Sequence, residues 1–420
     1  MIKSQTNCSD LNEPDLITVT TALQKILAQI KPLQQYQRIG LDQACGRTLY
    51  HAVIAPFNVP PHRNSAVDGY AINSTDLPES GDTSELVIAG AAYAGQPFTG
   101  ALAPGECLRI MTGAPVPEPL NVVIMQEQVE RFNNTITLDH THRRHQNIRQ
   151  AGEDIAQGCP VLLAGKLLTP ADIGLLASLG LTEIDVTRKL RIAIASTGDE
   201  LHSLGSELAP GGIYDSNCHT LKASLERPDI TVVNLGILDD NPASLQRCFE
   251  ETATHCDLII STGGVSVGDA DHTRTALRAL GSIEFWKVAI KPGRPLAFGC
   301  LNKTPFFGLP GNPVAVLVTL YQFVLPAIDK MLGITDRPVC PAFTALSTEA
   351  IRKRPGRTEI QRGIISQTTT GHWHVKTTGQ QGSGILRSMS LANAFIILEH
   401  DRGPVKKGDP VTVQPFAGLL

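Results

Sequence analysis

Between residues 190 and 332, apolar runs of strand length alternate with segments of helical periodicity, and this alternation constrains the fold more than any other feature. The strand-like runs are "LRIAIAST" (190–197), "ITVVNLGI" (230–237), "DLIIS" (257–261), "EFWKVAI" (284–290), "PLAFG" (295–299) and "PFFGL" (305–309). The helical segments lie at 216–227, 242–255, 271–280 and 312–332. Parallel strands need crossovers that are usually helices, so the alternation predicts a layered α/β domain around a mostly parallel sheet.

The flanking segments predict further domains. "ITVTTALQKILAQI" (17–30) is typical of a helix capped by Thr18 or Thr20, and residues 40–56 are interpreted as a second helix. Short β-type runs predict a β domain at 58–154, and "LTPADIGLLASLGL" (168–181) returns to helix. We expect a multidomain α/β plus β fold divided into a discontinuous helical and extended domain (1–57 and 155–188), an inserted β domain (58–154), the α/β domain (189–338) and a C-terminal β-barrel-like domain (339–420).

The composition argues against several kinds of partner and location. The formal net charge is −4, so overall charge does not favour nucleic acid or an anionic membrane. The N-terminal stretch lacks the apolar core of a secretory signal, and no run of about 18 apolar residues indicates a membrane span. The nine cysteines are scattered without a C-x-x-C pair, which favours reduced thiols in a cytoplasmic protein over a structural zinc site.

Charged or glycine-rich loops follow five of the predicted strands. Ligands of open α/β sheets bind beyond the carboxyl ends of the strands, so we expect these loops to meet at one sheet edge. The loops are "STGDEL" with Asp199 and Glu200, "LDDN" with Asp239 and Asp240, "STGGVSVGDAD" with Asp269 and Asp271, "KPGRP" with Lys291 and Arg294, and "PGNP".

The glycines and the last helix start favour an oxyanion ligand. Gly263 and Gly264 allow close approach of the backbone, and Ser266 adds a hydrogen-bond donor. Asn312 is placed to cap the helix that Pro313 begins, so free N–H groups would point at the ligand.

Two lysines and the carboxylates extend this prediction to phosphate and a metal ion. Lys287 and Lys291 are four residues apart, which on one strand places both on the same face, about 13 Å apart. Cations and a helix start favour phosphate or a similar tetrahedral oxyanion. Carboxylates beside phosphate imply Mg²⁺, because the like charges would otherwise repel.

Each loop also has a simpler interpretation. A Gly-Gly pair after a strand is often only a turn, and an aspartate at a helix start, as at Asp271, is often a cap. Asp239 and Asp240 also fit a turn, while Glu200 and Lys287 also fit a solvent-exposed face. We favour a ligand site because all five loops are expected at one sheet edge.

Seven motifs occur in order between about residue 60 and residue 390: "NSAVDGYA" (64–71), "RIMTGAPVP" (109–117), "RQAGEDI" (149–155), "STGDEL" (196–201), "STGGVSVGDAD" (261–271), "FWKVAIKPGRP" (285–295) and "LPGNPVA" (309–315). This ordered set resembles the molybdopterin molybdenumtransferase family, the bacterial MoeA-type proteins, and is similar to the E domain of gephyrin. Single motifs such as GGVSVG also occur in related molybdopterin-binding domains, whereas the full set is particular to this family.

The resemblance implies four subdomains, with a three-layer α/β molybdopterin-binding domain, in an elongated homodimer whose site combines the α/β domain of one subunit with the "SAVDGYA" domain of the other. It implies that adenylylated molybdopterin and molybdate bind as substrates. Mg²⁺ would assist cleavage of the pyrophosphate link, molybdenum would join the dithiolene, and AMP would leave. Implied partners are molybdopterin-synthesis proteins and enzymes that accept the cofactor, with no nucleic acid and no membrane.

The loops and the resemblance together define the expected site residues. The expected catalytic residues are Asp68, Asp154, Glu200, Asp240, Asp271, Lys287 and Lys291. Of these, Glu200 and Asp271 are the expected metal ligands. The expected substrate-binding residues are Thr112, Arg149, Gly263, Gly264, Ser266, Arg294, Pro310, Asn312, Pro313, Arg362 and Ser383.

Two residues depart from the family pattern. Arg294 stands where many members have the second Lys of "KPGKP", which keeps the charge but replaces a point ammonium with a planar fork. Ala315 stands where many members have Ser, and the missing hydroxyl predicts weaker molybdate affinity if that group helps to hold molybdate.

Several motifs keep structural interpretations. The histidines of "DHTHRRHQ" (139–146) are interpreted as a hairpin tip rather than a metal site. Asp68-Gly69 alone would predict a type I′ hairpin turn, Thr112-Gly113 alone a turn, and Asp154 alone a solvated loop carboxylate.

Two other functions compete with metal transfer. One is the preceding adenylylation of molybdopterin with ATP, which a domain of the same α/β type performs; the extra domains and the "LPGNP" and "SAVDGYA" motifs argue against it. The other is a non-catalytic molybdopterin-binding scaffold, because gephyrin-like E domains also bind receptor peptides, although nothing in the sequence marks a peptide groove.

Overall fold

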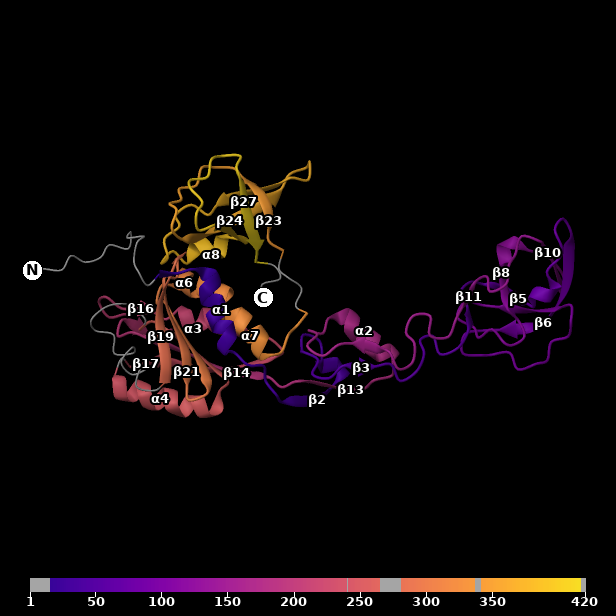
Figure 1. The fold of residues 1–420 in the computed structure, drawn as a ribbon, viewed down its shortest axis with the longest axis horizontal. Coiled ribbons are helices and arrows are strands. Elements are labelled where there is room, and N and C mark those ends of the chain that lie inside the picture. Colours follow the sequence, from indigo (N-terminus) through magenta and orange to yellow (C-terminus); the bar gives the residue numbers. More distant parts are fainter. Residues whose placement is uncertain (1–15, 240, 265–280, 337–340, 417–420) are drawn as a thin grey trace, which may run out of the picture. The chain divides into compact units, whose positions relative to one another are not determined.

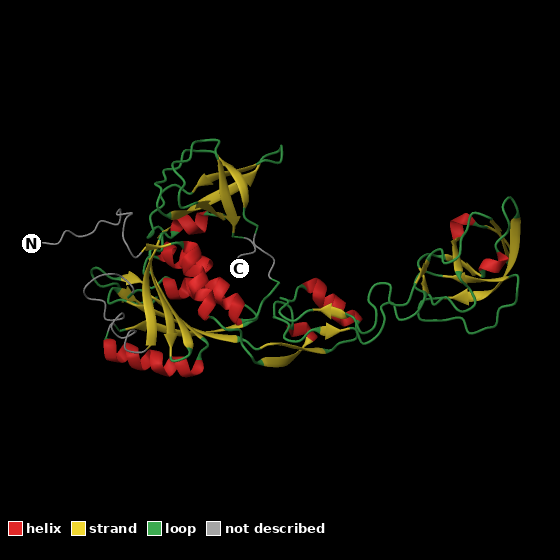
Figure 2. Cartoon of the chain, in the orientation of Figure 1, coloured by secondary structure: helices red, strands yellow, loops and turns green. Residues whose placement is uncertain are grey.

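The computed structural model describes residues 16–239, 241–264, 281–336 and 341–416. The chain forms two compact units. The larger unit comprises Met1–Tyr50, Gly165–Thr169 and Glu183–Leu420, and the smaller unit comprises His51–Ala164 and Pro170–Thr182. Figure 2 shows that strands dominate the smaller unit and the C-terminal part of the larger unit.

The larger unit contains the predicted mostly parallel sheet. Its seven strands lie in the order β1 (Leu16–Ile17), β19 (Gly281–Val288), β21 (Pro295–Leu301), β22 (Thr304–Leu309), β18 (Leu258–Thr262), β14 (Leu190–Thr197) and β17 (Ile230–Leu238). Only β21 runs against the other six. The carboxyl ends of β14, β17, β18, β19 and β22 therefore share one edge, as the sequence predicted.

Helices cover both faces of this sheet, as expected for a layered α/β domain (Figure 1). Alternate residues of β14 point to opposite faces: Ile192 and Ile194 pack in one core cluster, Ala193 and Ala195 in the other. The first cluster is covered by α1 (Val19–Gln29), α3 (Asn217–Leu225), α6 (Pro313–Thr319) and α7 (Leu325–Met331), and the second by α4 (Pro242–His255).

The segment from α6 to α7 is one long apolar helix with a π-helical stretch at Leu320–Val324. Pro326 is the second residue of α7, just beyond this stretch, and the wider turn accommodates a ring that has no N–H to donate. Contrary to the sequence expectation, Pro313–Met331 has the length and hydropathy of a membrane span. Its apolar window is 78% buried inside the protein, so it is a core helix of the α/β layer.

The N-terminal region partly follows the prediction. Helix α1 begins after Thr18, whose hydroxyl oxygen accepts from the backbone N of Thr21 at 3.1 Å. The helix predicted over 40–56 is wrong: β2 (Tyr36–Gly40) leads into a short 3₁₀ turn, and β2 pairs antiparallel with β13 (Glu183–Thr187). Gly46, at φ +74°, takes a left-handed conformation that interrupts any helix there.

The smaller unit is built around a six-stranded sheet. The order is β8 (Val122–Met125), β5 (Gly69–Ile72), β7 (Glu106–Ile110), β6 (Thr83–Ala92), β10 (Thr135–Asp139) and β9 (Glu130–Phe132). Two strand pairs, β4 (Asn64–Ser65) with β11 (Ile148–Arg149) and β3 (Val53–Ile54) with β12 (Pro160–Leu162), and helix α2 (Pro170–Ser178) complete it. Residues 58–154 thus contain the predicted β structure.

The C-terminal strands close into a barrel. Five strands pair in a ring: β24 (Thr358–Gln367), β25 (Trp373–Thr377), β23 (Phe343–Ser347), β27 (Pro410–Pro415) and β26 (Ala394–Leu398), which returns to β24. The short strand β20 (Ile290–Lys291) adds to β24, and α8 (Arg387–Leu391) precedes β26. This arrangement confirms the barrel-like C-terminal domain.

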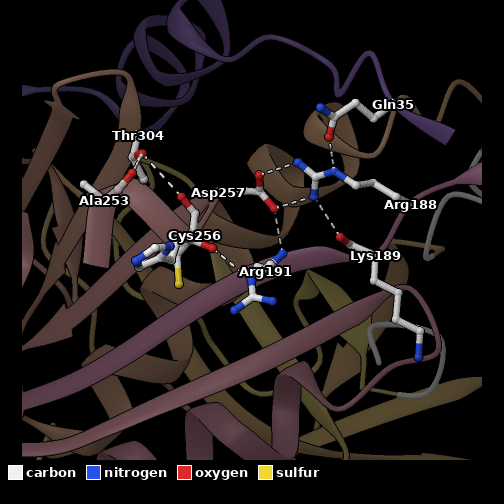
Figure 3. Close-up of polar contacts among 9 residues, drawn as sticks. Gln35, Arg188, Lys189, Arg191, Ala253, Cys256, Asp257 and Thr304 are labelled. Atoms are coloured by element: carbon white, nitrogen blue, oxygen red, sulfur yellow. Dashed lines mark hydrogen bonds and ion pairs between the residues drawn. The ribbon is translucent and has the colours of Figure 1, made fainter. Parts of the chain in front are cut away.

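An ion-pair network fixes the amino ends of β14 and β18 (Figure 3). Two guanidinium nitrogens of Arg188 lie 2.7 Å from the two carboxylate oxygens of Asp257, and the side chain of Gln35 accepts from Arg188 Nε. Asp257 also accepts from the backbone N of Arg191 at 2.8 Å. Hydrogen bonding to Asp257 raises the pKa of Arg188. The amino edge of the sheet thus has a structural role. It lies opposite the carboxyl edge, where the predicted ligand loops are.

Candidate functional site

A cavity of about 540 Å³ lies at the carboxyl edge of the seven-stranded sheet. Its walls come from four stretches of the larger unit: the ends of β14 and β18 with their loops, the turn before α6, the segment that starts α3, and the loop before α8. The cavity therefore joins three of the five predicted loops to a segment of the C-terminal domain.

Four predicted site residues line this cavity: Glu200, Gly263, Asn312 and Pro313. Gly263 has φ +85°, and a Cβ atom there would lie 2.2 Å from the carbonyl oxygen of Thr197. Only glycine fits this position, so the loop after β18 must pass close to the end of β14. This geometry is consistent with the prediction that Gly263 allows close approach of the backbone.

The turn before α6 differs in one detail from the prediction. Asn312 occupies the N-cap position and Pro313 begins the helix, but the Asn312 side chain makes no capping hydrogen bond. Instead, the backbone N of Val314 donates to the carbonyl oxygen of Ser383 at 3.1 Å. The loop of Ser383 thus contacts the helix start, and its neighbour Gly384 lines the cavity.

Arg362, on barrel strand β24, contacts the segment that carries Ser383. Its side chain is almost fully buried, at 1% exposed, and does not line the cavity. Its guanidinium donates to Ser388 Oγ at 2.9 Å and to the carbonyl oxygen of Gly382 at 3.1 Å. Burial lowers the pKa of Arg362 to about 10, so the group is still charged at neutral pH. Its described contacts therefore place it as a support for the segment that carries Ser383.

The predicted basic residues lie on two sheets. Lys287 is at the end of β19, whereas Lys291 lies on β20, which pairs with the barrel strand β24. The expectation that both share one strand face is therefore wrong, because β19 ends at Val288 and Lys291 belongs to β20. Lys291 Nζ lies 3.3 Å from the buried carboxylate of Glu359, and Arg294 is half-buried at the turn into β21.

Three predicted residues, Asp240, Ser266 and Asp271, lie outside the described residues. Within the described ranges, no group of three His, Cys, Asp or Glu side chains is placed to hold a metal ion. Glu200 is thus the one expected metal ligand whose position is described. Gly264 has φ +64°, and Pro310 directly precedes the cavity residue Gly311.

The smaller unit brings together two of its four predicted residues. Asp68 Oδ1 accepts from both the backbone N and the hydroxyl of Thr112, and these bonds lower the pKa of Asp68. The hairpin alternative for Asp68 is wrong, because the flanking strands β4 and β5 pair with other strands. Arg149, on β11, and Asp154 are both exposed, and among the described residues no side-chain hydrogen bond or ion pair joins them to Asp68 and Thr112.

The segment that starts α3 lines the cavity but was not among the predicted site residues. Asp215 is only 5% exposed, and its Oδ1 accepts from Ser196 Oγ at 3.0 Å and from the backbone N of Asn217 at 2.9 Å. Both Asp215 and Asn217 line the cavity. The available signals were an Asp just before a helical segment and a Ser within the apolar run 190–197.

Comparisons with known proteins cover almost the whole chain. Residues 17–180 match the MoeA N-terminal region (domain I and II), residues 193–330 a probable molybdopterin binding domain, and residues 344–416 the MoeA C-terminal region (domain IV). A molybdopterin molybdenumtransferase of Haemophilus influenzae is 43% identical over 406 residues, covering 96% of this chain and 100% of that protein.

More distant relatives agree. Molybdopterin molybdenumtransferase 2 of Mycobacterium tuberculosis is 33% identical, covering 93% of this chain and 97% of its own. Gephyrin of Dictyostelium discoideum is 32% identical, covering 94% of this chain and 62% of its own. The crystal structure of a molybdopterin biosynthesis moeA protein from Pyrococcus horikoshii OT3 superposes with a TM-score of 0.84 at 28% identity, covering 95% of this chain and 100% of that one.

Proposed function

Because the chain belongs to the family of molybdopterin molybdenumtransferases, enzymes that insert molybdenum into molybdopterin, we propose that its substrate is adenylylated molybdopterin and that the reaction requires Mg²⁺ and releases AMP. The observation that carries this proposal is the cavity at the carboxyl edge of the sheet, where Glu200, the Gly263 loop and the start of α6 converge.

Anion binding rests on the backbone around the cavity. The Gly263 loop passes within reach of β14, and the start of the long helix adds the positive end of its dipole. Lys287, near the carboxyl end of β19, adds positive charge to the same edge, and Lys291 and Arg294 follow it in the chain. In this arrangement the chain would orient the pyrophosphate and stabilise the charge that develops on the leaving AMP, without a nucleophilic side chain.

The donor set fits a magnesium ion that shares its ligands with the substrate. Mg²⁺ in phosphate-transferring sites is usually held by one or two carboxylates together with substrate phosphates. Glu200 supplies one carboxylate in the cavity, and Asp271 is the second ligand proposed from the sequence. When bound, Mg²⁺ would neutralise pyrophosphate charge during cleavage.

Roles for the remaining residues belong to the same proposal. Asp240 would act with Glu200 on the reacting groups. In the smaller unit, Asp68 and Asp154 would act on them as well, with Thr112 and Arg149 binding substrate. Ser383, held through Arg362, would bind substrate. We further propose a cytoplasmic homodimer that receives its substrate from molybdopterin-synthesis proteins and passes the product to cofactor-accepting enzymes.

The decisive experiment measures AMP release from adenylylated molybdopterin by the purified protein, with Mg²⁺, in the presence and absence of molybdate. Release that depends on molybdate supports the proposal. Tight binding without AMP release would favour a scaffold. Formation of adenylylated molybdopterin from ATP and molybdopterin would favour the preceding reaction instead.

A further inference from the structure

Asn217 lines the cavity, and its side-chain amide has one atom bonded and the other unsatisfied. The residue is 7% exposed, and its Nδ2 donates to the carbonyl oxygen of Gly311 at 2.8 Å. Its Oδ1 is buried and has no hydrogen-bond partner within the part of the chain that the structure describes. Buried polar atoms in folded proteins are normally paired, so this oxygen calls for an external donor.

The geometry fixes which amide atom is left over. If Asn217 were turned so that Oδ1 met the Gly311 carbonyl, two acceptors would face each other without a donor. The backbone holds the residue as well, because Asn217 N donates to Asp215 Oδ1, which Ser196 also binds. The oxygen therefore stays unpaired in this conformation.

A bare acceptor selects for particular parts of a ligand. Pyrophosphate oxygens and molybdate oxygens at neutral pH are themselves acceptors and would be repelled by Oδ1. The neutral donors of adenylylated molybdopterin are the ribose hydroxyls, the adenine amino group and the N–H groups of the pterin. The unsatisfied oxygen thus marks where a ribose or a heterocycle lies, rather than a phosphate.

We propose that Asn217 is a substrate-specificity residue, whose Oδ1 accepts a hydrogen bond from a neutral N–H or O–H donor of the substrate while Nδ2 positions the turn at Gly311. This inference rests on the proposed function, because it takes adenylylated molybdopterin as the ligand. It adds to the site a residue that lies in none of the seven family motifs.

The test compares dissociation constants for two probes, AMP and molybdopterin, each of which carries one set of candidate donors. Asn217→Ala is expected to weaken one probe by about threefold to tenfold, the effect of one neutral hydrogen bond, and to leave the other within about twofold. The weakened probe identifies the donor: AMP for ribose or adenine, molybdopterin for the pterin.

Two further variants separate binding from folding. Asn217→Leu keeps a similar side-chain volume and removes both amide atoms, so it should weaken the same probe as Asn217→Ala. Asn393→Ala removes another amide that bonds to backbone, at Ile365, outside the cavity, and should lower Tm without changing either dissociation constant.

Unchanged dissociation constants for both probes in both Asn217 variants would overturn the inference. If Asn217→Ala does not fold, Asn217→Leu decides: a dissociation constant weaker by about threefold to tenfold for one probe supports the inference, and unchanged dissociation constants for both contradict it. Wild-type protein that binds both probes but releases no AMP would instead contradict the proposed function.

Discussion

The backbone N–H and the hydroxyl of Thr112 both donate to one oxygen of Asp68, and each donor lies 2.8 Å from that oxygen. The two residues are 44 positions apart in the sequence and meet in the smaller unit. These hydrogen bonds hold the pKa of the Asp68 carboxyl below its usual value. Two residues proposed to act on the substrate are therefore one structural pair.

Thr112→Val removes the hydroxyl donor and keeps the backbone donor. We expect the pKa of Asp68 to rise toward its ordinary value, measured by an NMR titration of the carboxyl group. Thr83→Val, on an exposed position of β6, is the matched control and should leave the Asp68 pKa unchanged. An unshifted pKa in Thr112→Val would show that the hydroxyl contributes nothing.

Glu200→Ala and Asp271→Ala should each lower Mg²⁺-dependent AMP release by about 100-fold or more, because even supporting residues of metal sites are worth about 10–100-fold. Circular dichroism and Tm should stay close to wild type. Glu207→Ala, an exposed carboxylate of the same loop region, is the control and should retain full activity. Near-normal release by both variants would remove these two carboxylates from the metal site.

Arg362→Lys tests whether the buried guanidinium supports the Ser383 loop. One ammonium cannot reproduce the fork that reaches both Ser388 and Gly382, so we expect a loss of about 1.5–3 kcal/mol in unfolding free energy. Denaturant unfolding measures it, and kcat/KM should fall in parallel. The exposed Arg352→Lys should change neither quantity, whereas equal stability of both variants would contradict the supporting role.

Cys218 predicts a pH dependence of stability. Burial raises the pKa of its thiol to about 12 from an ordinary value of 9.0. Below pH 9 the thiol is protonated in both states, and its contribution to stability is fully present. Above pH 9 only the unfolded chain loses the proton, so unfolding free energy falls by about 1.4 kcal/mol per pH unit until the folded pKa is reached.

Denaturant unfolding between pH 8 and pH 11 measures this slope. Other groups titrate in the same range, so the informative quantity is the difference between wild type and Cys218→Ala, which should have the smaller slope. Parallel stability curves for the two proteins would rule out the coupling.

Ala315→Ser restores the hydroxyl found in many family members. Ala315 is 2% exposed in the first turns of α6. Its carbonyl oxygen lies 3.8 Å from the position that a Cβ atom on Gly293, the glycine of "KPGRP", would occupy. We expect Ser to tighten molybdate binding by about threefold to tenfold, measured by titration. Ala315→Cys adds similar volume with a weak donor and should not. No gain with Ser would sink the predicted role.

The mostly parallel layered sheet and the site edge could be predicted from the sequence, because they follow from the alternation of strands and helices. Helix α4 begins at Pro242 and ends at His255, as its periodicity and its Asn-Pro start predicted. Once strands and helices alternate, parallel strands place the loops of Glu200, Gly263 and Asn312 together without further information.

The failures arise where distant residues decide the local structure. Residues 40–56 contain helix-forming residues, but Thr48 and Leu49 bridge to Leu167 and Val186, and β3 pairs with β12. These partners, more than 100 positions away, hold the chain extended. The strand of Lys287 ends because the chain crosses to the barrel, which no local pattern announces. Likewise, the bond between Asn217 and Gly311 spans 94 positions and cannot be read from either segment alone.

The pairing of β1 with β19 sets an order of events during synthesis. Leu16 pairs with Lys287, so the first strand of the sheet has no partner until more than half of the 420-residue chain has left the ribosome. Residues 51–164, by contrast, emerge together and contain the complete six-stranded sheet of the smaller unit. The smaller unit can therefore fold first. Until the later strands are synthesised, the apolar residues of β1 and α1 have no sheet to pack against and remain exposed, as in the intermediates that chaperones bind.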